Sequence, residues 1–176
     1  QNKGVVCGAA WTEKFGVRHI VIDQMEDLSK LCHSKYLQSN MGMVYREIES
    51  YVKQGRLTLF SACPCQIAGL YAYLGQEYDN LYTIDLLCAD SPSTKFFQKY
   101  LKETFGEDEV ESYTFRDKTL GWPTYTIHVI LKNGKELVRT IEDDLYQQAF
   151  HPRLMMPSHC EECRYCGFPR QGDITI

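Results

Sequence analysis

The sequence predicts an α/β fold: a mixed sheet with flanking helices, a β-hairpin in the second half, and an irregular, Cys-rich C-terminal loop. Short apolar runs of strand length alternate with segments whose apolar residues recur at helical spacing, which is the pattern of an α/β domain. Asn133-Gly134 separates two later strand-like runs and is typical of a tight hairpin turn. Residues 151–176 show neither periodicity, so we expect a loop there that something else must order.

The first part of the chain is expected to alternate strands and helices. The expected strands are Val5–Trp11, His19–Ile22, Leu57–Phe60 and Leu81–Leu87. The last two are mainly apolar, as in buried parallel strands. The expected helices are Met41–Gln54, Gln66–Leu74 and a segment that Ser91-Pro92 opens and Gly106 ends. Serine is a preferred N-cap, proline suits the first turn, and glycine commonly follows the last turn.

Three more strands and a short helix are expected after Gly106. The strands are Val110–Phe115, Tyr125–Leu131 and Glu136–Ile141, and the helix is Asp143–Phe150. We expect residues 1–150 to form an α/β core domain and residues 151–176 to be a loop of the same domain. The chain as a whole is expected to be a fragment of a longer protein.

Composition argues against two classes of partner. The chain has 176 residues, which is about one domain and long enough to bury a core. Its net charge of −4 gives no bulk electrostatic basis for binding nucleic acid or an anionic membrane. No apolar run approaches the roughly 20 residues of a membrane span. We therefore expect no nucleic-acid partner and no membrane span.

The eight cysteines are expected to be reduced thiols of a cytoplasmic protein. Disulfides would suit a small secreted protein, but this chain has helix and strand patterns that do not need such cross-links. Some of the cysteines also stand at Cys-x-Cys and Cys-x-x-Cys spacing, which is too tight for ordinary structural bridges. Cys7 and Cys32 lie within apolar or helical stretches and are expected to be inert core residues.

The other cysteines follow two expected strands and recur in the C-terminal loop. They are Cys63, Cys65, Cys88, Cys160, Cys163 and Cys166. Ligand sites of open α/β sheets gather beyond the carboxyl ends of the strands. If the strands before Cys63 and Cys88 are parallel, both segments reach the same edge, and the C-terminal loop could fold over it. This placement predicts a shared metal site, and metal binding would help to order the loop.

The residues alone leave several kinds of site open. An iron–sulfur cluster uses four thiolates and would draw on all three segments. A structural zinc ion could bind Cys160 and Cys163 with the neighbouring His159. Cys63 and Cys65 could instead form a dithiol redox pair. Free buried thiols in a structural domain are the remaining alternative.

Five motifs stand in a fixed order along the chain. They are Gly4-Val5-Val6-Cys7-Gly8-Ala9-Ala10, Ser34-Lys35-Tyr36-Leu37-Gln38-Ser39, Phe60-Ser61-Ala62-Cys63-Pro64-Cys65-Gln66-Ile67-Ala68-Gly69-Leu70, Phe115-Arg116-Asp117-Lys118 with Gly121-Trp122, and Gly172-Asp173-Ile174-Thr175-Ile176. Together they resemble the C-terminal domain of the coenzyme F-420 hydrogenase/dehydrogenase beta-subunit family. The resemblance covers essentially the whole chain.

The resemblance implies an oxidoreductase that depends on flavin and on iron–sulfur. Members of the family pass electrons between a cluster, a bound FAD and a hydride-carrying partner such as the deazaflavin coenzyme. The implied cofactors are a 4Fe–4S cluster and FAD, with zinc as the alternative metal. The implied partners are a ferredoxin-like domain or protein and a small-molecule redox substrate. The alternative function is a non-catalytic zinc-binding or structural interaction domain.

The resemblance also implies which residues form the sites. The implied cluster ligands are Cys65, Cys88, Cys160 and Cys163, with Cys63 and Cys166 as alternates. The implied flavin-site residues are Ser34, Lys35, Tyr36, Gln38, Ser39, Ser61 and Gln66. No catalytic residue is assigned.

The sequence departs from the usual pattern of the family near the cysteines. Cys63 stands where relatives usually have threonine, and Ala89-Asp90 follow Cys88 where relatives have His-Gly. The sequence has no Gly-x-Gly-x-x-Gly fingerprint, so any flavin must be held by the family's own loops. Relatives usually continue beyond Ile176, so we expect that this stretch on its own could lack activity.

Overall fold

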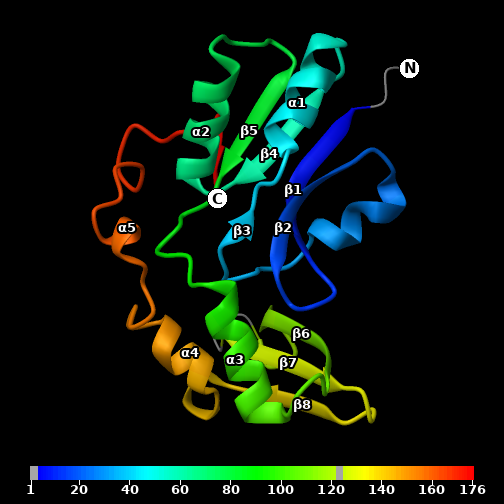
Figure 1. The fold of residues 1–176 in the computed structure, drawn as a ribbon, viewed down its shortest axis with the longest axis vertical. Helices are drawn as coiled ribbons and strands as arrows, with labels where there is room; N and C mark the ends of the chain where they lie inside the picture. Colours follow the sequence, from blue (N-terminus) through cyan, green and yellow to red (C-terminus); the bar gives the residue numbers. More distant parts are fainter. Residues whose placement is uncertain (1–3, 122–124) are drawn as a thin grey trace.

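The computed structural model describes residues 4–121 and 125–176, which form two sheets with helices packed around them (Figure 1). The larger sheet has the strand order β3-β2-β1-β4-β5-β9. Its strands are β1 (Val5–Trp11), β2 (Val17–Ile22), β3 (Ser39–Asn40), β4 (Thr58–Ala62), β5 (Leu81–Asp85) and β9 (Ile174–Thr175). The smaller, antiparallel sheet consists of β6 (Val110–Asp117), β7 (Thr126–Leu131) and β8 (Glu136–Arg139).

Helices connect the strands and cover the sheets. The α-helices of the described residues are α1 (Val44–Lys53), α2 (Pro64–Leu74), α3 (Thr94–Phe105), α4 (Leu145–Phe150) and α5 (Ser158–Glu161). The described residues also form the 3-10 helices η1 (Met25–Leu31) and η3 (Ile141–Asp143). The predicted α/β architecture with its mixed sheet, flanking helices and second-half hairpin is confirmed.

The larger sheet is mixed because one of its central pairs is antiparallel. β2 pairs antiparallel with β1, whereas β1, β4, β5 and β9 pair in parallel. β4 and β5 stay in register from the pair Thr58 and Leu81 to the pair Ala62 and Asp85. The parallel direction indicated by the apolar runs before the cysteines is therefore confirmed.

Helices α1 and α2 form one core with the larger sheet. Val44, Ile48 and Val52 line the buried face of α1, as their helical spacing predicts. They belong to one cluster with Phe60 of β4 and Ile67 of α2, whose side chains are fully buried.

A second, aromatic core lies between α3 and the smaller sheet (Figure 1). Phe97 of α3 is fully buried, and its ring centroid lies 5.0 Å from that of Tyr113 and 4.9 Å from that of Tyr146. Trp11, at the end of β1, stacks on Phe97 with a centroid distance of 6.0 Å. The aromatic core therefore joins the two sheets.

The segment between β2 and α1 differs from the sequence prediction. η1 and the short strand β3 were not expected there. No residue of η1 is fully buried, so no apolar period marks it in the sequence. β2 also begins at Val17, ahead of the predicted His19. Trp122 of the fourth motif lies outside the described residues.

The C-terminal segment is mostly irregular, as predicted, but its end joins the larger sheet. β9 pairs in parallel with β5, so that Ile174 lies opposite Ile84 and Thr175 opposite Asp85. Helix α5 adds one short helical turn within the loop. In the part of the chain that the structure describes, no helix has the length and apolar character needed to cross a bilayer.

Replacing Phe97 by alanine is expected to lower the free energy of unfolding by about 3–5 kcal/mol, because the lost ring leaves a cavity in the aromatic core. Chemical denaturation measures this change. Phe96→Ala is the matched control, since the Phe96 side chain is 47% exposed. It is expected to cost less than about 1 kcal/mol. Equal losses in the two variants would show that Phe97 does not anchor this core.

Candidate metal centre

Two cysteine segments leave the same edge of the larger sheet. β4 ends at Ala62 and is followed by Cys63, while β5 ends at Asp85 and leads to Cys88. Because the two strands are parallel and Ala62 pairs with Asp85, the segments emerge next to each other. The backbone N–H of Leu86 also donates to the Ala62 carbonyl oxygen at 3.2 Å, which extends the pairing beyond the strands.

The first cysteine segment is fixed by the start of α2. Cys63 is the N-cap residue and Pro64 is the first helical residue. The side-chain oxygen of Gln66 accepts the backbone N–H of Cys63 at 3.1 Å, so one of the free N–H groups at the helix start is satisfied. Cys65 is exposed and lies in the first helical turn, after Cys63 and Pro64.

Five thiols from the three segments interact electrostatically at this edge. They are Cys63, Cys65, Cys88, Cys160 and Cys163. A hydrogen bond between Cys63 and Cys88 raises the pKa of Cys63 and lowers the pKa of Cys88. Burial, followed by the charge of Cys88, raises the pKa values of Cys65 and Cys160. Thiolates that repel one another in this way are suited to a bound cation, which would neutralise them.

Cys166 differs from the other two cysteines of the C-terminal loop. Its thiol donates a hydrogen bond to the carbonyl oxygen of Cys163 at 3.1 Å. It also lines a cavity of about 220 Å³ together with Cys88, Arg153 and Arg170. The loop therefore contributes Cys160 and Cys163 to the five-thiol group.

A site for a single ion is not preformed. Among residues 4–121 and 125–176, no group of three or more His, Cys, Asp or Glu side chains is arranged to hold a metal ion. Cys160, Cys163 and His159, which the sequence suggested as possible zinc ligands, thus do not form such a group among the described residues.

The C-terminal tail is attached to β5 beyond its cysteines. Asp173 Oδ2 accepts hydrogen bonds from the backbone N–H of Thr83 at 2.7 Å and from its hydroxyl at 2.9 Å. The N–H of Leu87 donates to the carbonyl oxygen of Ile176 at 2.8 Å. These bonds hold the tail beside the segment that leads to Cys88.

A buried histidine connects three of the residues that the family resemblance assigned to the flavin site. His19 Nδ1 lies 2.6 Å from Ser39 Oγ, and His19 Nε2 lies 3.1 Å from the Ser61 carbonyl oxygen. Gln66 Nε2 donates to Ser39 Oγ at 3.0 Å. Since Gln66 also binds the N–H of Cys63, the network ties β2 and β3 to the first cysteine segment.

The partners of His19 determine its tautomer. A carbonyl oxygen only accepts, so Nε2 carries the hydrogen that is donated to Ser61, and Nδ1 accepts from the Ser39 hydroxyl. Burial lowers the pKa of His19 to about 4, so the ring is neutral near pH 7. No sequence motif singled out His19. Its one signal was a polar side chain among the apolar residues of β2.

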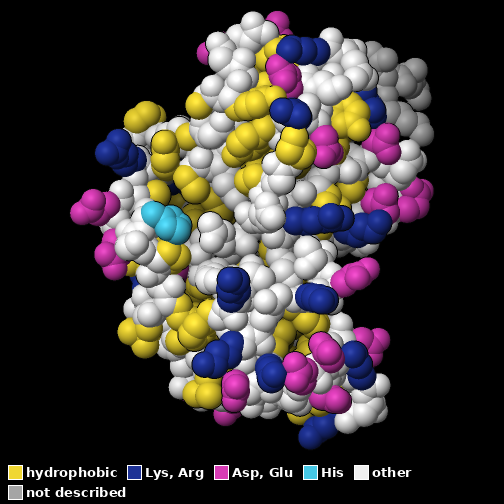
Figure 2. All heavy atoms as spheres, in the orientation of Figure 1, with side chains coloured by type: hydrophobic (Ala, Val, Ile, Leu, Met, Phe, Trp, Pro, Cys, Tyr) yellow, Lys and Arg dark blue, Asp and Glu magenta, His cyan; other side chains and the backbone are white. Residues whose placement is uncertain are grey.

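A cavity of about 570 Å³ lies between the β1–β2 hairpin and β6. Its walls include the rings of Trp11 and Phe15, the cationic side chains of Arg18 and Lys30, and Ser34 of the predicted flavin site. Figure 2 shows the molecule narrowing between the part with the larger sheet and the part with the smaller sheet, both of which contribute to this cavity. Glu13 and Glu111 also line the cavity. Lys30 Nζ lies 2.7 Å from Asp27 Oδ1, so groups of both charges stand beside the apolar rings. The rings and Arg18 would suit a ligand with a flat ring and an anionic part.

The remaining predicted flavin-site residues have other surroundings. Lys35 Nζ donates to the carbonyl oxygen of Cys32 at 2.7 Å, and burial lowers the pKa of Lys35 to about 8. The Tyr36 ring stacks on Phe150 with a centroid distance of 4.7 Å and therefore packs within the protein. The Gln38 side chain is exposed.

Cys7 and Cys32 were predicted to be inert core residues, and this prediction is wrong for Cys32. Cys7 is fully buried, as predicted for an inert core residue. Cys32 is exposed because it follows η1, a helix without buried residues, and it lines the cavity beside β6.

Comparisons with known proteins agree with the motif series. Residues 55–176 match the family model for the C terminus of the beta subunit of coenzyme F420 hydrogenase/dehydrogenase. The fold is similar to that of a chain in the xenon-derivatized F420-reducing NiFe hydrogenase complex from Methanosarcina barkeri, with a TM-score of 0.51 and 12% sequence identity. The match covers 78% of this chain and 48% of that chain, so this chain spans about half the length of its structural neighbour. No curated protein matched the sequence.

The stability of the protein is expected to depend on the protonation of His19. The folded-state pKa of about 4 lies below the value of 6.5 for a free histidine. Between these values the unfolded chain takes up a proton that the folded chain does not, so stability falls as the pH drops through this range. The loss attributable to His19 amounts to about 3 kcal/mol at pH 4.

Denaturant titrations of the wild type and of His19→Asn between pH 7 and pH 4 measure this contribution. The stability of His19→Asn should fall less steeply because asparagine takes up no proton. His33→Asn, at an exposed position, is the control and should retain the wild-type profile. Parallel profiles for the wild type and His19→Asn would rule out a neutral His19 in the folded state.

Proposed function

Because this chain belongs to the coenzyme F420 hydrogenase/dehydrogenase beta-subunit family, we propose that it is an electron-transfer oxidoreductase domain. It would relay electrons between an iron–sulfur cluster, a bound flavin and a hydride-carrying partner. The observation that carries this proposal is the five-thiol group, to which two parallel strand ends and the C-terminal loop contribute.

The proposed ligands of a 4Fe–4S cluster are Cys65, Cys88, Cys160 and Cys163. In such a cluster each thiolate binds a different iron, so the ligands surround the cluster. A zinc ion requires its ligands to converge on one point in a tetrahedron. The spread of the five thiols over three segments supports the cluster over structural zinc.

The two alternate cysteines are proposed to remain thiols beside the cluster. Cys63 is less exposed than Cys65 and shares a hydrogen bond with Cys88. Cys65 is the exposed thiol of the same segment and is therefore the better ligand. The thiol of Cys166 donates a hydrogen bond to the carbonyl oxygen of Cys163. Only the protonated thiol can donate this bond, so the bond stabilises the thiol form of Cys166.

The cavity beside β6 is the proposed flavin site. Trp11 and Phe15 offer apolar surface for a ring, and Arg18 and Lys30 offer charge for the phosphates of FAD. Successive residues of a strand point to opposite faces, so Arg18 reaches the cavity while His19 reaches Ser61. β2 would thus hold the flavin on one face, and on the other it contacts the end of β4 that precedes the cysteines.

Of the remaining predicted residues, Ser34 lines the cavity directly, whereas Lys35 and Tyr36 follow it in the chain and do not line the cavity. Ser39, Ser61 and Gln66 would position the cysteine turn through the His19 network.

When bound, a cluster supplies one-electron transfer and a flavin couples it to two-electron hydride chemistry. The residues of this chain would hold the cofactors, exclude water and adjust potentials through hydrogen bonds and burial. The proposed partners are a ferredoxin-like domain or protein as electron partner and a small-molecule redox substrate, such as the deazaflavin coenzyme. We propose a cytoplasmic location, where cysteines are kept reduced.

Replacing Cys88 by serine is expected to remove most of the cluster, because Cys88 interacts with thiols of both other segments. The chain would be reconstituted anaerobically with iron and sulfide, and its visible absorption and iron content measured. Cys166→Ser is the matched control and should keep the wild-type iron content. If Cys166→Ser lost as much iron as Cys88→Ser, the ligand assignment would be wrong. A colourless wild type with about one zinc per chain would instead support the zinc-binding alternative.

Replacing Ser34 by tryptophan is expected to fill part of the cavity and to weaken FAD binding at least about tenfold, which corresponds to about 1.4 kcal/mol. The quenching of flavin fluorescence on titration with protein gives the dissociation constant. Ser50→Trp, on the exposed side of α1, is the control and should bind FAD as the wild type does. Unchanged binding by Ser34→Trp would place the flavin elsewhere.

A further inference from the structure

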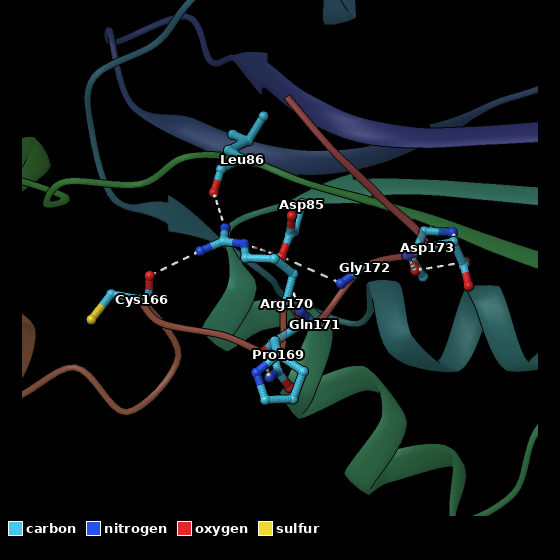
Figure 3. Close-up of polar contacts among 9 residues, drawn as sticks. Asp85, Leu86, Cys166, Pro169, Arg170, Gln171, Gly172 and Asp173 are labelled. Carbon is cyan, nitrogen blue, oxygen red and sulfur yellow. Dashed lines mark hydrogen bonds and ion pairs between the residues drawn. The ribbon is translucent and has the colours of Figure 1, made fainter.

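The buried carboxylate of Asp85, at the end of β5, binds the C-terminal tail (Figure 3). Asp85 is completely buried, and its Oδ2 accepts the backbone N–H groups of Gln171 at 3.0 Å and Gly172 at 3.3 Å. A Cβ on Gly172 would lie 2.7 Å from the backbone nitrogen of Asp85, so only glycine allows this approach. The tail is therefore docked against β5 by close backbone contact.

The guanidinium of Arg170 joins this carboxylate to the cysteine loop (Figure 3). Its Nε lies 3.2 Å from Asp85 Oδ2, and its side chain is only 10% exposed. Nη1 donates to the carbonyl oxygen of Cys166 at 3.0 Å, and Nη2 donates to that of Leu86 at 2.8 Å. One planar group thus binds the strand end, the segment that leads to Cys88, and the loop that carries the other thiols.

The charges of this pair lie next to the thiols. Arg170 and Cys88 line the same cavity of about 220 Å³. Burial opposes ionisation of Asp85, but the hydrogen bonds that it accepts, together with the charge of Arg170, hold its pKa below the usual value. Both groups are therefore charged near neutral pH, and their burial limits the screening of these charges by solvent.

We propose that the Arg170–Asp85 ion pair positions the Cys160–Cys166 loop against Cys88 and sets the reduction potential of the cluster. This inference rests on the proposed function, because it takes the five-thiol group as the cluster site. Arg170 and Asp85 are positioning residues, since neither is proposed to touch the cluster.

The positioning role predicts a change in backbone exchange, and the electrostatic role predicts a change in reduction potential. Loss of either partner weakens the attachment to β5 of the segment that directly follows the loop, so both single variants should accelerate backbone exchange at Gln171 and Gly172. Reduction adds negative charge to a cluster, which a fixed positive charge favours and a fixed negative charge opposes. Arg170→Gln leaves the Asp85 carboxylate uncompensated and should lower the potential. Asp85→Asn leaves the Arg170 charge uncompensated and should raise it.

The first measurement is hydrogen exchange on the chain without metal. The N–H groups of Gln171 and Gly172 are expected to exchange at least about tenfold faster in Arg170→Gln and in Asp85→Asn than in the wild type. The control is Arg164→Gln, which removes the same charge from an exposed position of the same loop and should leave exchange unchanged. Wild-type exchange rates in both test variants would overturn the positioning role.

The second measurement is an anaerobic redox titration of the reconstituted variants, followed by electron paramagnetic resonance. Potentials that shift in opposite directions for Arg170→Gln and Asp85→Asn, with a smaller shift for Arg164→Gln, are expected. Metal affinity should fall about 10- to 100-fold in both test variants. Shifts of the same sign would overturn the electrostatic role and leave a structural one.

The outcomes also separate this inference from the proposed function. A wild-type chain that takes up no cluster would contradict the proposed function and the potential-setting role with it. The positioning role would still be decided by the exchange rates of the metal-free chain.

Discussion

The parallel pairing of β4 with β5 is the constraint on which the candidate site depends. It brings Cys63 and Cys65 to the same edge as Cys88, although the two segments are separated by a helix and a strand. It also leaves the outer side of β5 open for β9, which returns the C-terminal tail to this edge. The tail has little apolar content, and metal binding was expected to help to order it. Strand pairing and the hydrogen bonds of Asp85 and Asp173 attach its end to β5.

The same edge is supported from the other side by β2. His19 binds the end of β4 and the Ser39–Gln66 pair, while Arg18 faces the cavity beside β6. A metal centre and a ring-binding cavity are thus proposed on neighbouring strands of one sheet. The aromatic core around Phe97 keeps the smaller sheet against this region, so that the cavity has a second wall. The strand ends and α2 would give both proposed cofactors one rigid side, and the C-terminal loop would complete the metal centre.

Much of the fold could be predicted because hydrophobic periodicity marks it directly. β1, α1 and the β7–β8 hairpin were found in this way, and the cysteines after β4 and β5 followed from the rule for parallel strand ends. η1, β3 and β9 were missed because they are short or carry few buried residues. His19 and Asp85 were missed for a different reason. Their importance arises from partners far away in the sequence, which no local pattern records.

The central claim is that one cluster lies between the strand ends and the C-terminal loop. X-ray diffraction from crystals of the anaerobically reconstituted chain, recorded on both sides of the iron absorption edge, tests it most directly. The account predicts one compact group of anomalous iron peaks, bordered by Cys65, Cys88, Cys160 and Cys163. A single peak at the zinc edge on Cys160 and Cys163, or iron located away from Cys88, would contradict it.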